Sequence, residues 1–129
     1  MWMFNRNNSP IMEAIDRSQA IIEFAPDGTI LTANNNFLKV VGYKLDEIKG
    51  RHHRLFVDPI ESEGQEYKAF WIALAKGEFK ASEYRRFGKS GKPIWLQATY
   101  NPILDRAGKT TRILSPSYSS GCCGRWVLG

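Results

Sequence analysis

The chain has 129 residues, a formal net charge of +5, and 43% hydrophobic against 24% charged residues, the balance of one globular domain. No apolar run approaches the roughly 20 residues of a membrane span, no segment recurs at a fixed period, and the first residues do not read as a secretory signal. Acidic and basic residues are mixed without a continuous basic stripe, which disfavours nucleic-acid binding. We therefore expect a cytoplasmic domain without a membrane span.

The first part of the chain predicts a flanking helix followed by a β-hairpin. Apolar residues within 11–20 have the spacing of a short amphipathic helix. Two β-type runs follow at 21–24 and 30–33, and a Pro-Asp-Gly turn joins them. Residues 1–20 are accordingly interpreted as a lead-in and flanking helix outside the main domain.

The middle of the chain predicts several helices. One of the asparagines at 34–36 is expected to cap a helix that ends at Gly42, and a second short helix is expected at 45–48. The longest helix is expected from about Ile60 to Lys76, because four large apolar residues share one of its faces: Tyr67, Phe70, Trp71 and Leu74.

In the last part of the chain, the pattern of apolar residues changes to a repeat of two residues, which is typical of β-strands. Strands are expected at 79–87 and 94–103, and a last strand is expected to begin near Lys109. Pro116 cannot donate a ladder hydrogen bond, so we expect it at a sheet edge or outside the sheet. Residues 115–129 are interpreted as an atypical, flexible tail.

Strands at both ends of the chain with helices between them predict an α+β fold. We expect a five-stranded antiparallel sheet over residues 21–114, with short helices and one longer helix packed on one face. The opposite face would expose Trp95. We therefore expect a homodimer that forms through Trp95 together with Ile11 and Ile15 of the flanking helix.

Short motifs in a fixed order extend from about residue 15 to residue 108. Between Asp27 and Gly50 the sequence fits the pattern DGxIxxANxxFxxxxGYxxxExxG. In this pattern the chain resembles a PAS domain. The runs at 52–59 and 100–105 are most similar to the PAS sensor domains of bacterial methyl-accepting chemotaxis transducers of the aerotaxis type. The resemblance implies a dimeric sensory input module that relays its signal to an output domain lying outside this chain.

Haem is one cofactor that the resemblance leaves open. His52 and His53 are the only histidines, and both fall on the segment that would line the mouth of a pocket between helices and sheet. A neutral imidazole nitrogen can ligate iron, and the resemblance implies an axial histidine in this region. His53 is the candidate metal ligand, for haem only.

Flavin, as FAD, is the other cofactor left open. The resemblance to the flavin-binding aerotaxis transducer includes His53 and Trp71, and the Trp71 ring could stack on an isoalloxazine. The chain departs from that pattern at 57–60, where it lacks an Arg-His pair. A light-sensing cysteinyl-flavin site is disfavoured because the only cysteines lie in the tail, at 122 and 123.

The remaining candidate pocket residues are Asn34, Phe56 and Leu96, with helix capping as the alternative role for Asn34. A colourless small ligand, or a cofactor-free module for protein–protein interaction and dimerisation, stays open beside haem and FAD. No catalytic motif is present, so we expect a sensor rather than an enzyme.

Overall fold

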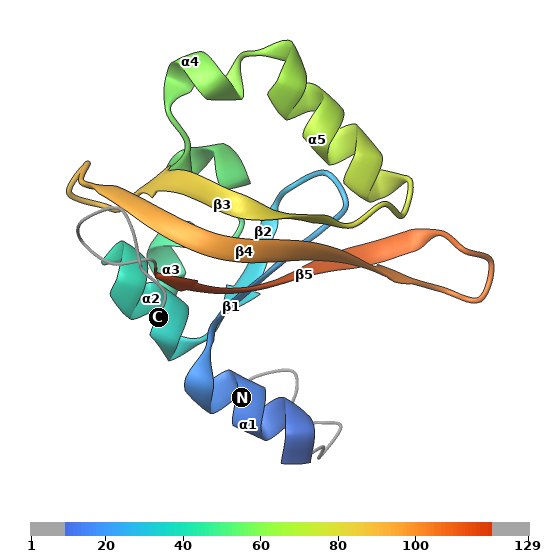
Figure 1. Ribbon diagram of the computed structural model, residues 1–129, viewed down its shortest axis with the longest axis horizontal. Helices are drawn as coiled ribbons and strands as arrows, with labels where there is room; N and C mark the ends of the chain where they lie inside the picture. The colour runs from blue at the N-terminus through green and yellow to red at the C-terminus, as the bar shows by residue number, and fades with distance from the viewer. Residues whose placement is uncertain (1–9, 120–129) are drawn as a thin grey trace.

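The computed structural model describes residues 10–119 as a curved antiparallel sheet with helices on one of its faces (Figure 1). The elements follow one another in the order α1 Pro10–Ser18, β1 Ala20–Phe24, β2 Ile30–Ala33, α2 Asn35–Val41, α3 Leu45–Ile48, the 3-10 helix η2 His53–Phe56, α4 Pro59–Ser62, α5 Gln65–Ala75, β3 Lys80–Phe87, β4 Pro93–Leu104 and β5 Thr110–Ser119.

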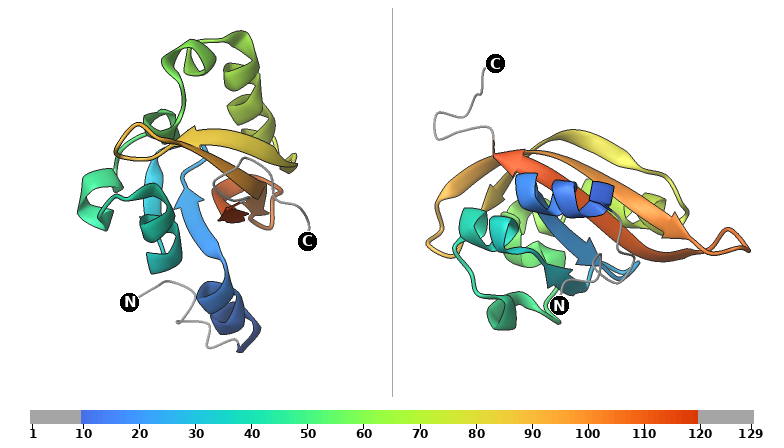
Figure 2. Two further views of the ribbon diagram at one scale, coloured as in Figure 1. Left: turned by 60° about the vertical axis from the view of Figure 1, so that its left-hand side comes forward. Right: turned by 90° about the horizontal axis from the view of Figure 1, so that it is seen from below.

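The strand order β2-β1-β5-β4-β3 places the last strand of the chain in the centre of the sheet. The hairpin of β1 and β2 and the hairpin of β3 and β4 therefore lie in one layer, joined through β5. Figure 2 shows α2 to α5 covering one face of this layer. The predicted α+β class and the five-stranded antiparallel sheet are confirmed.

Pro116 lies in the middle of the sheet, so the prediction that it belongs at an edge or outside the sheet is wrong. It is paired with Ile21 in an uninterrupted ladder between β1 and β5. On the other side, pairing with β4 stops after Ser117 and resumes at Leu114. A residue in an antiparallel strand directs its N–H to one neighbouring strand only. The interruption toward β4 therefore accommodates the missing donor.

The sheet also extends further along the chain than the sequence predicted. β5 reaches Ser119, so the boundary of the expected tail at residue 115 falls inside a central strand. The pairing of β5 with both β1 and β4 supplies the partners that local sequence reasoning could not identify. Residues 120–129, with Cys122 and Cys123, lie outside the described residues.

The single helix expected over 60–76 is divided into α4 and α5. The break falls at Gly64, which has extended backbone angles (φ −83°, ψ 165°) and precedes the first residue of α5. Asp58 begins α4 by accepting a hydrogen bond from the Ile60 amide at 2.9 Å. Glycine is a poor helix former, and the break lets α5 lie across the sheet at its own angle, as Figure 1 shows.

The residues expected to mediate dimerisation lie on the outer face of the sheet and on α1. Trp95 is half-buried rather than exposed, and it lies opposite Arg85 of β3. Ile11 is exposed on α1, which projects beyond the body of the sheet in Figure 1. The Asn36 amide fixes the end of α1 to α2 by donating to the Arg17 carbonyl at 2.9 Å. The side chain of Ile15 lies outside the described part of the structure.

Candidate ligand site between sheet and helices

The space between the helices and the inner face of the sheet is filled with aromatic rings. α5 contributes Trp71 and Phe70, and the inner face of β4 contributes Tyr100, whose ring centroid lies 4.9 Å from that of Phe70. Seven rings make up this aromatic cluster: Phe24, His53, Tyr67, Phe70, Trp71, Tyr84 and Tyr100. The cavity that remains beside the cluster has a volume of about 10 Å³, which is room for about one water molecule.

His53 lies at the centre of the cluster and uses both of its ring nitrogens. Nδ1 is 2.7 Å from the Tyr67 hydroxyl, and Nε2 is 3.1 Å from the Tyr100 hydroxyl. Burial holds the pKa of His53 well below its usual value of 6.5, and the nearby Arg86 charge acts in the same direction. His53 is therefore a neutral imidazole near pH 7, with one nitrogen donating and the other accepting.

His52 connects the β1–β2 turn to the 3-10 helix η2 through hydrogen bonds. Its Nε2 is 2.8 Å from the Asp27 carbonyl oxygen, and its Nδ1 accepts a hydrogen bond from the Arg54 amide at 3.0 Å. Because a carbonyl oxygen can only accept, the proton of the neutral ring is on Nε2. Gly28, with a φ of +98°, leaves room for this ring, since a Cβ there would lie 2.5 Å from Nε2. His52 is thus occupied as a structural residue.

Trp71 is buried in the same cluster. Its ring meets Phe24 and His53 edge-on, with centroid separations of 5.4 and 5.3 Å. Burial raises the pKa of Tyr67 to about 12, and the neighbouring Trp71 indole opposes that shift. The Trp71 Nε1 nevertheless lacks an acceptor in hydrogen-bonding geometry among the described residues. The surrounding rings leave no free face on which a planar cofactor could stack.

Asn34 has the capping role that the sequence offered as an alternative. Its Oδ1 accepts hydrogen bonds from the amides of Phe37 and Ile21, both at 3.0 Å, and its Nδ2 donates to the Gln19 carbonyl at 2.9 Å. One side chain therefore begins α2 and holds it against the start of β1. Asn34 does not line the remaining cavity, so its role is structural.

Of the six predicted pocket residues, His53, Phe56 and Leu96 line the same small cavity. Arg86 lines it too, and sequence reasoning missed this residue. The Arg86 side chain is only 4% exposed, and its Nη1 lies 3.4 Å from a Glu61 carboxylate oxygen. The guanidinium carbon lies 4.8 Å from the ring centre of Tyr84. The alternation of β3 could have revealed Arg86, since it shares the inward parity of Tyr84.

Two buried polar atoms beside the cavity have no hydrogen-bond partner among the described residues, the Arg86 Nε and the Ser117 Oγ. Both residues line the remaining cavity. Unsatisfied buried groups of this kind are costly and are commonly met by a water molecule. The remaining cavity is therefore suited to a very small polar molecule such as water.

Neither haem nor FAD fits this arrangement. A pocket for such a cofactor needs several hundred Å³, whereas about 10 Å³ remains. An axial ligand needs a free ring nitrogen, and both nitrogens of His53 and both of His52 are engaged. His53 is therefore not placed as a metal ligand, and no group of three metal-ligating side chains occurs among the described residues.

Comparison with known proteins identifies the family. The sequence profile described as "PAS fold" matches residues 30–115. The chain belongs to the PAS fold family. The match covers β2, the helices from α2 to α5, the hairpin of β3 and β4 and the first part of β5, so every residue of the aromatic cluster except Phe24 lies within the matched PAS segment. Within residues 10–119, no helix has the length and apolar character needed to cross a membrane.

Several curated proteins contain a segment that is similar to this chain. The chain is 43% identical over 103 residues to the biofilm dispersion protein BdlA of Pseudomonas aeruginosa, covering 80% of the chain and 25% of that protein. It is 27% identical over 116 residues to a blue-light-activated histidine kinase of Brucella canis, covering 81% of the chain and 24% of the kinase. The chain thus spans about a quarter of each relative and is a PAS sensory domain of the kind found in signalling proteins.

Solved structures confirm the fold. A light-oxygen-voltage domain studied with a flavin analogue superimposes with a TM-score of 0.72 at 22% identity, covering 90% of this chain and 88% of that one. A PAS domain from Colwellia psychrerythraea gives a TM-score of 0.73 at 19% identity, covering 84% and 92%. At such identities the similarity concerns the backbone architecture alone.

Proposed function

We propose that this PAS domain is the sensory input module of a signalling protein of the chemotaxis type, and that it works without a haem or flavin between its sheet and helices. The observation that carries the proposal is the engagement of both His53 nitrogens by Tyr67 and Tyr100 inside a filled aromatic cluster. Opening that space would require breaking both hydrogen bonds and moving several packed rings. Such a domain acts by binding and relay rather than by turnover.

The absorption spectrum of the purified chain tests this proposal. Protein produced in cells supplied with a haem precursor and riboflavin is expected to show neither a Soret band nor flavin bands at stoichiometric intensity. Added hemin is expected to give the same weak spectrum with the wild-type chain and with His53→Leu, because His53 offers iron no free nitrogen. A stoichiometric Soret band that His53→Leu abolishes, or stoichiometric flavin bands, would overturn the proposal.

The relay step of the proposal uses contacts between two copies of the chain. The outer face of the sheet carries Trp95, half-buried on β4, and Tyr118, exposed on β5. Large aromatic residues on a sheet face are the type that dominates binding energy in protein interfaces. α1 would join this contact through Ile11, which is 72% exposed. A change in the inner cluster would reach this face through the shared strands β4 and β5.

Trp95→Ala is expected to raise the dimer dissociation constant about 30-fold, the effect of losing roughly 2 kcal/mol from a central interface residue. Sedimentation velocity over a range of protein concentrations measures the change. Ile60→Ala is the matched control, because Ile60 is highly exposed on the helical side at α4 and should leave the dimer unaffected. Equal dimer content in wild type and Trp95→Ala at every concentration would contradict the proposed interface.

A further inference from the structure

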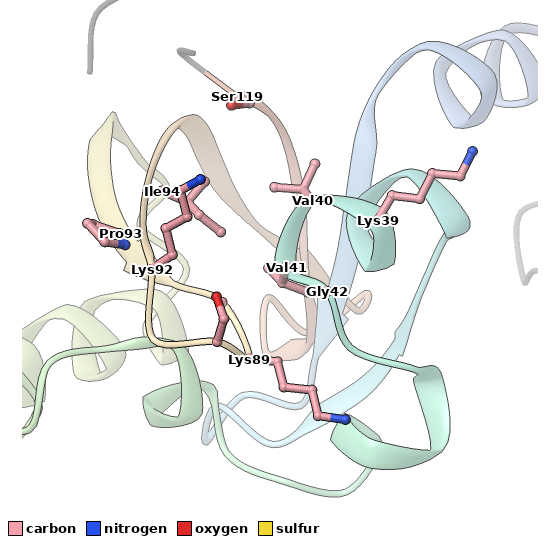
Figure 3. A pocket seen from close by; sticks show the side chains of 11 residues that line it. Lys39, Val40, Val41, Gly42, Lys89, Lys92, Pro93, Ile94 and Ser119 are labelled. Carbon is pink, nitrogen blue, oxygen red and sulfur yellow. The ribbon is translucent and has the colours of Figure 1, made fainter. Parts of the chain in front are cut away.

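A second and much larger hollow lies on the outside of the domain, where three segments distant in sequence meet. The C-terminal turn of α2, the turn between β3 and β4, and the end of β5 at Ser119 enclose a groove of about 510 Å³ (Figure 3). Val41 lines both this groove and the small inner cavity, so this residue lies between the two. We call this hollow the α2–β5 groove.

Backbone contacts fix the shape of the α2–β5 groove. Gly42 ends α2 in the left-handed conformation, with a φ of +77° and its N–H donated to the Leu38 carbonyl. The Lys89 amide donates to the Val41 carbonyl at 2.9 Å. Gly88 lies so close to that carbonyl that a Cβ would stand 2.8 Å from its oxygen. The hairpin turn is thus held directly against the helix end, which makes the groove a preformed feature.

The lining of the groove is apolar in the middle and basic at the rim. Figure 3 shows Val40 and Ile94 facing each other across the groove, with the Lys92 side chain beside Ile94, whereas the ends of the Lys39 and Lys89 side chains extend outward from the groove. None of the eleven lining residues is acidic. Three lysines contribute to the rim: Lys39, Lys89 and Lys92.

The three lysines differ in how their charges are compensated. Lys89 is paired with Glu47 of α3, and this ion pair raises the pKa of Lys89. Lys39 and Lys92 are exposed and take part in no ion pair within residues 10–119. The groove therefore combines an apolar floor with two uncompensated positive charges, in a chain whose formal net charge is +5.

We infer that the α2–β5 groove binds a small organic carboxylate with an apolar body, with the body over Val40 and Ile94, the carboxylate met by Lys92, and Lys39 adding a second positive charge at the rim. The volume is that of a small-molecule pocket, and such pockets are mostly apolar with a few polar groups that fix the ligand's orientation. The charge complementarity selects an anion over a neutral molecule. An occupant would contact α2 and the end of the central strand together.

The inference does not depend on what fills the inner cluster, because the linings of the groove and of the inner cavity share only Val41. It can therefore fail or hold independently of the proposed function. A ligand here would act on the outer ends of α2 and β5 without opening the aromatic core. This gives the domain a place outside its packed interior at which a small molecule could alter the sheet.

Octanoate is the probe for the test, because it joins one carboxylate to a flexible apolar chain. We expect saturable binding to the isotopically labelled chain, with amide chemical-shift changes concentrated at Val40, Val41, Gly88 and Ile94. Octanol, which has the same chain without the charge, is expected to bind at least five-fold more weakly. The double substitution Lys39→Gln with Lys92→Gln is expected to weaken octanoate binding about five-fold, as for the loss of two exposed charge pairs.

The matched control is the double substitution Lys76→Gln with Lys109→Gln. It removes the same charge from two exposed lysines outside the groove lining, so octanoate binding should not change. Shift changes outside the groove, equal binding of octanol and octanoate, or equal loss in both double variants would overturn the inference. A groove that binds an acidic peptide but not octanoate would also overturn it, because the occupant would then be a protein.

Discussion

Trp71→Ala is expected to lower the free energy of unfolding by about 3–5 kcal/mol, the usual cost of removing a large ring from a packed core. Trp71 is buried and meets Phe24, His53 and Phe70 at ring-centroid separations of 5.3–5.4 Å. Its removal leaves a cavity that the neighbouring rings cannot collapse into, since they are fixed by one another and by the sheet. Urea unfolding at pH 7.5 measures the change.

Two further variants separate packing from any role of the indole nitrogen. Trp71→Phe keeps an aromatic ring and removes an N–H that has no partner among the described residues, so a cost below about 1.5 kcal/mol is expected. Ile72→Ala changes the exposed neighbour on α5, which is 56% accessible, and should cost less than about 1 kcal/mol. A large loss of unfolding free energy in Trp71→Phe would contradict the conclusion that the Trp71 Nε1 is not needed for stability.

Acidification below pH 6.5 is expected to destabilise the domain by up to about 1.4 kcal/mol per pH unit through His53. In the folded state burial holds the pKa of His53 well below 6.5, while the unfolded chain has the ordinary value. Between the two values the unfolded state binds a proton that the folded state does not. The stability is therefore fully present above pH 6.5 and is lost as the pH falls toward the folded pKa.

Urea midpoints at several pH values between 7.5 and 5 measure this loss. His53→Gln is expected to flatten the dependence, whereas His52→Gln should remove only a smaller part, because His52 is less buried and its pKa is lowered less strongly. If His53→Gln does not fold, the ring protons of His53 can be titrated by NMR in the wild-type chain. Titration of His53 near pH 6.5 would contradict the buried, neutral imidazole.

The sequence predicted best those elements whose signals are local. The period-two pattern of β3 and β4, the turn between β1 and β2, and the asparagine cap of α2 all involve residues close together in the chain. Leu96, Ala98 and Tyr100 face the core as their alternation indicates. The helix over 60–76 was predicted too long because the chain is helical on both sides of Gly64, which separates α4 from α5, whereas the apolar residues used for the prediction all lie after it.

For the candidate site, the sequence identified His53 and Trp71 as site residues but did not predict which side chains surround them. The partners of His53 are Tyr67, fourteen residues away, and Tyr100, forty-seven residues away. No spacing rule connects positions so far apart across a 3-10 helix, a helix and a strand. The alternation of β3 places Arg86 on the inward face with Tyr84, but its contacts with Glu61 of α4 and with the Tyr84 ring depend on the tertiary structure.

The amino-acid order alone established the fold class, the family resemblance and the inward face of the strand over 94–103, because hydrophobic periodicity and turn chemistry act over a few residues. The tertiary structure decided two further matters. It placed β5, with Pro116, in the centre of the sheet, since only β1 and β4 together provide its partners. It also filled the interior with aromatic rings, because the volume left between packed layers depends on how every side chain meets its distant neighbours.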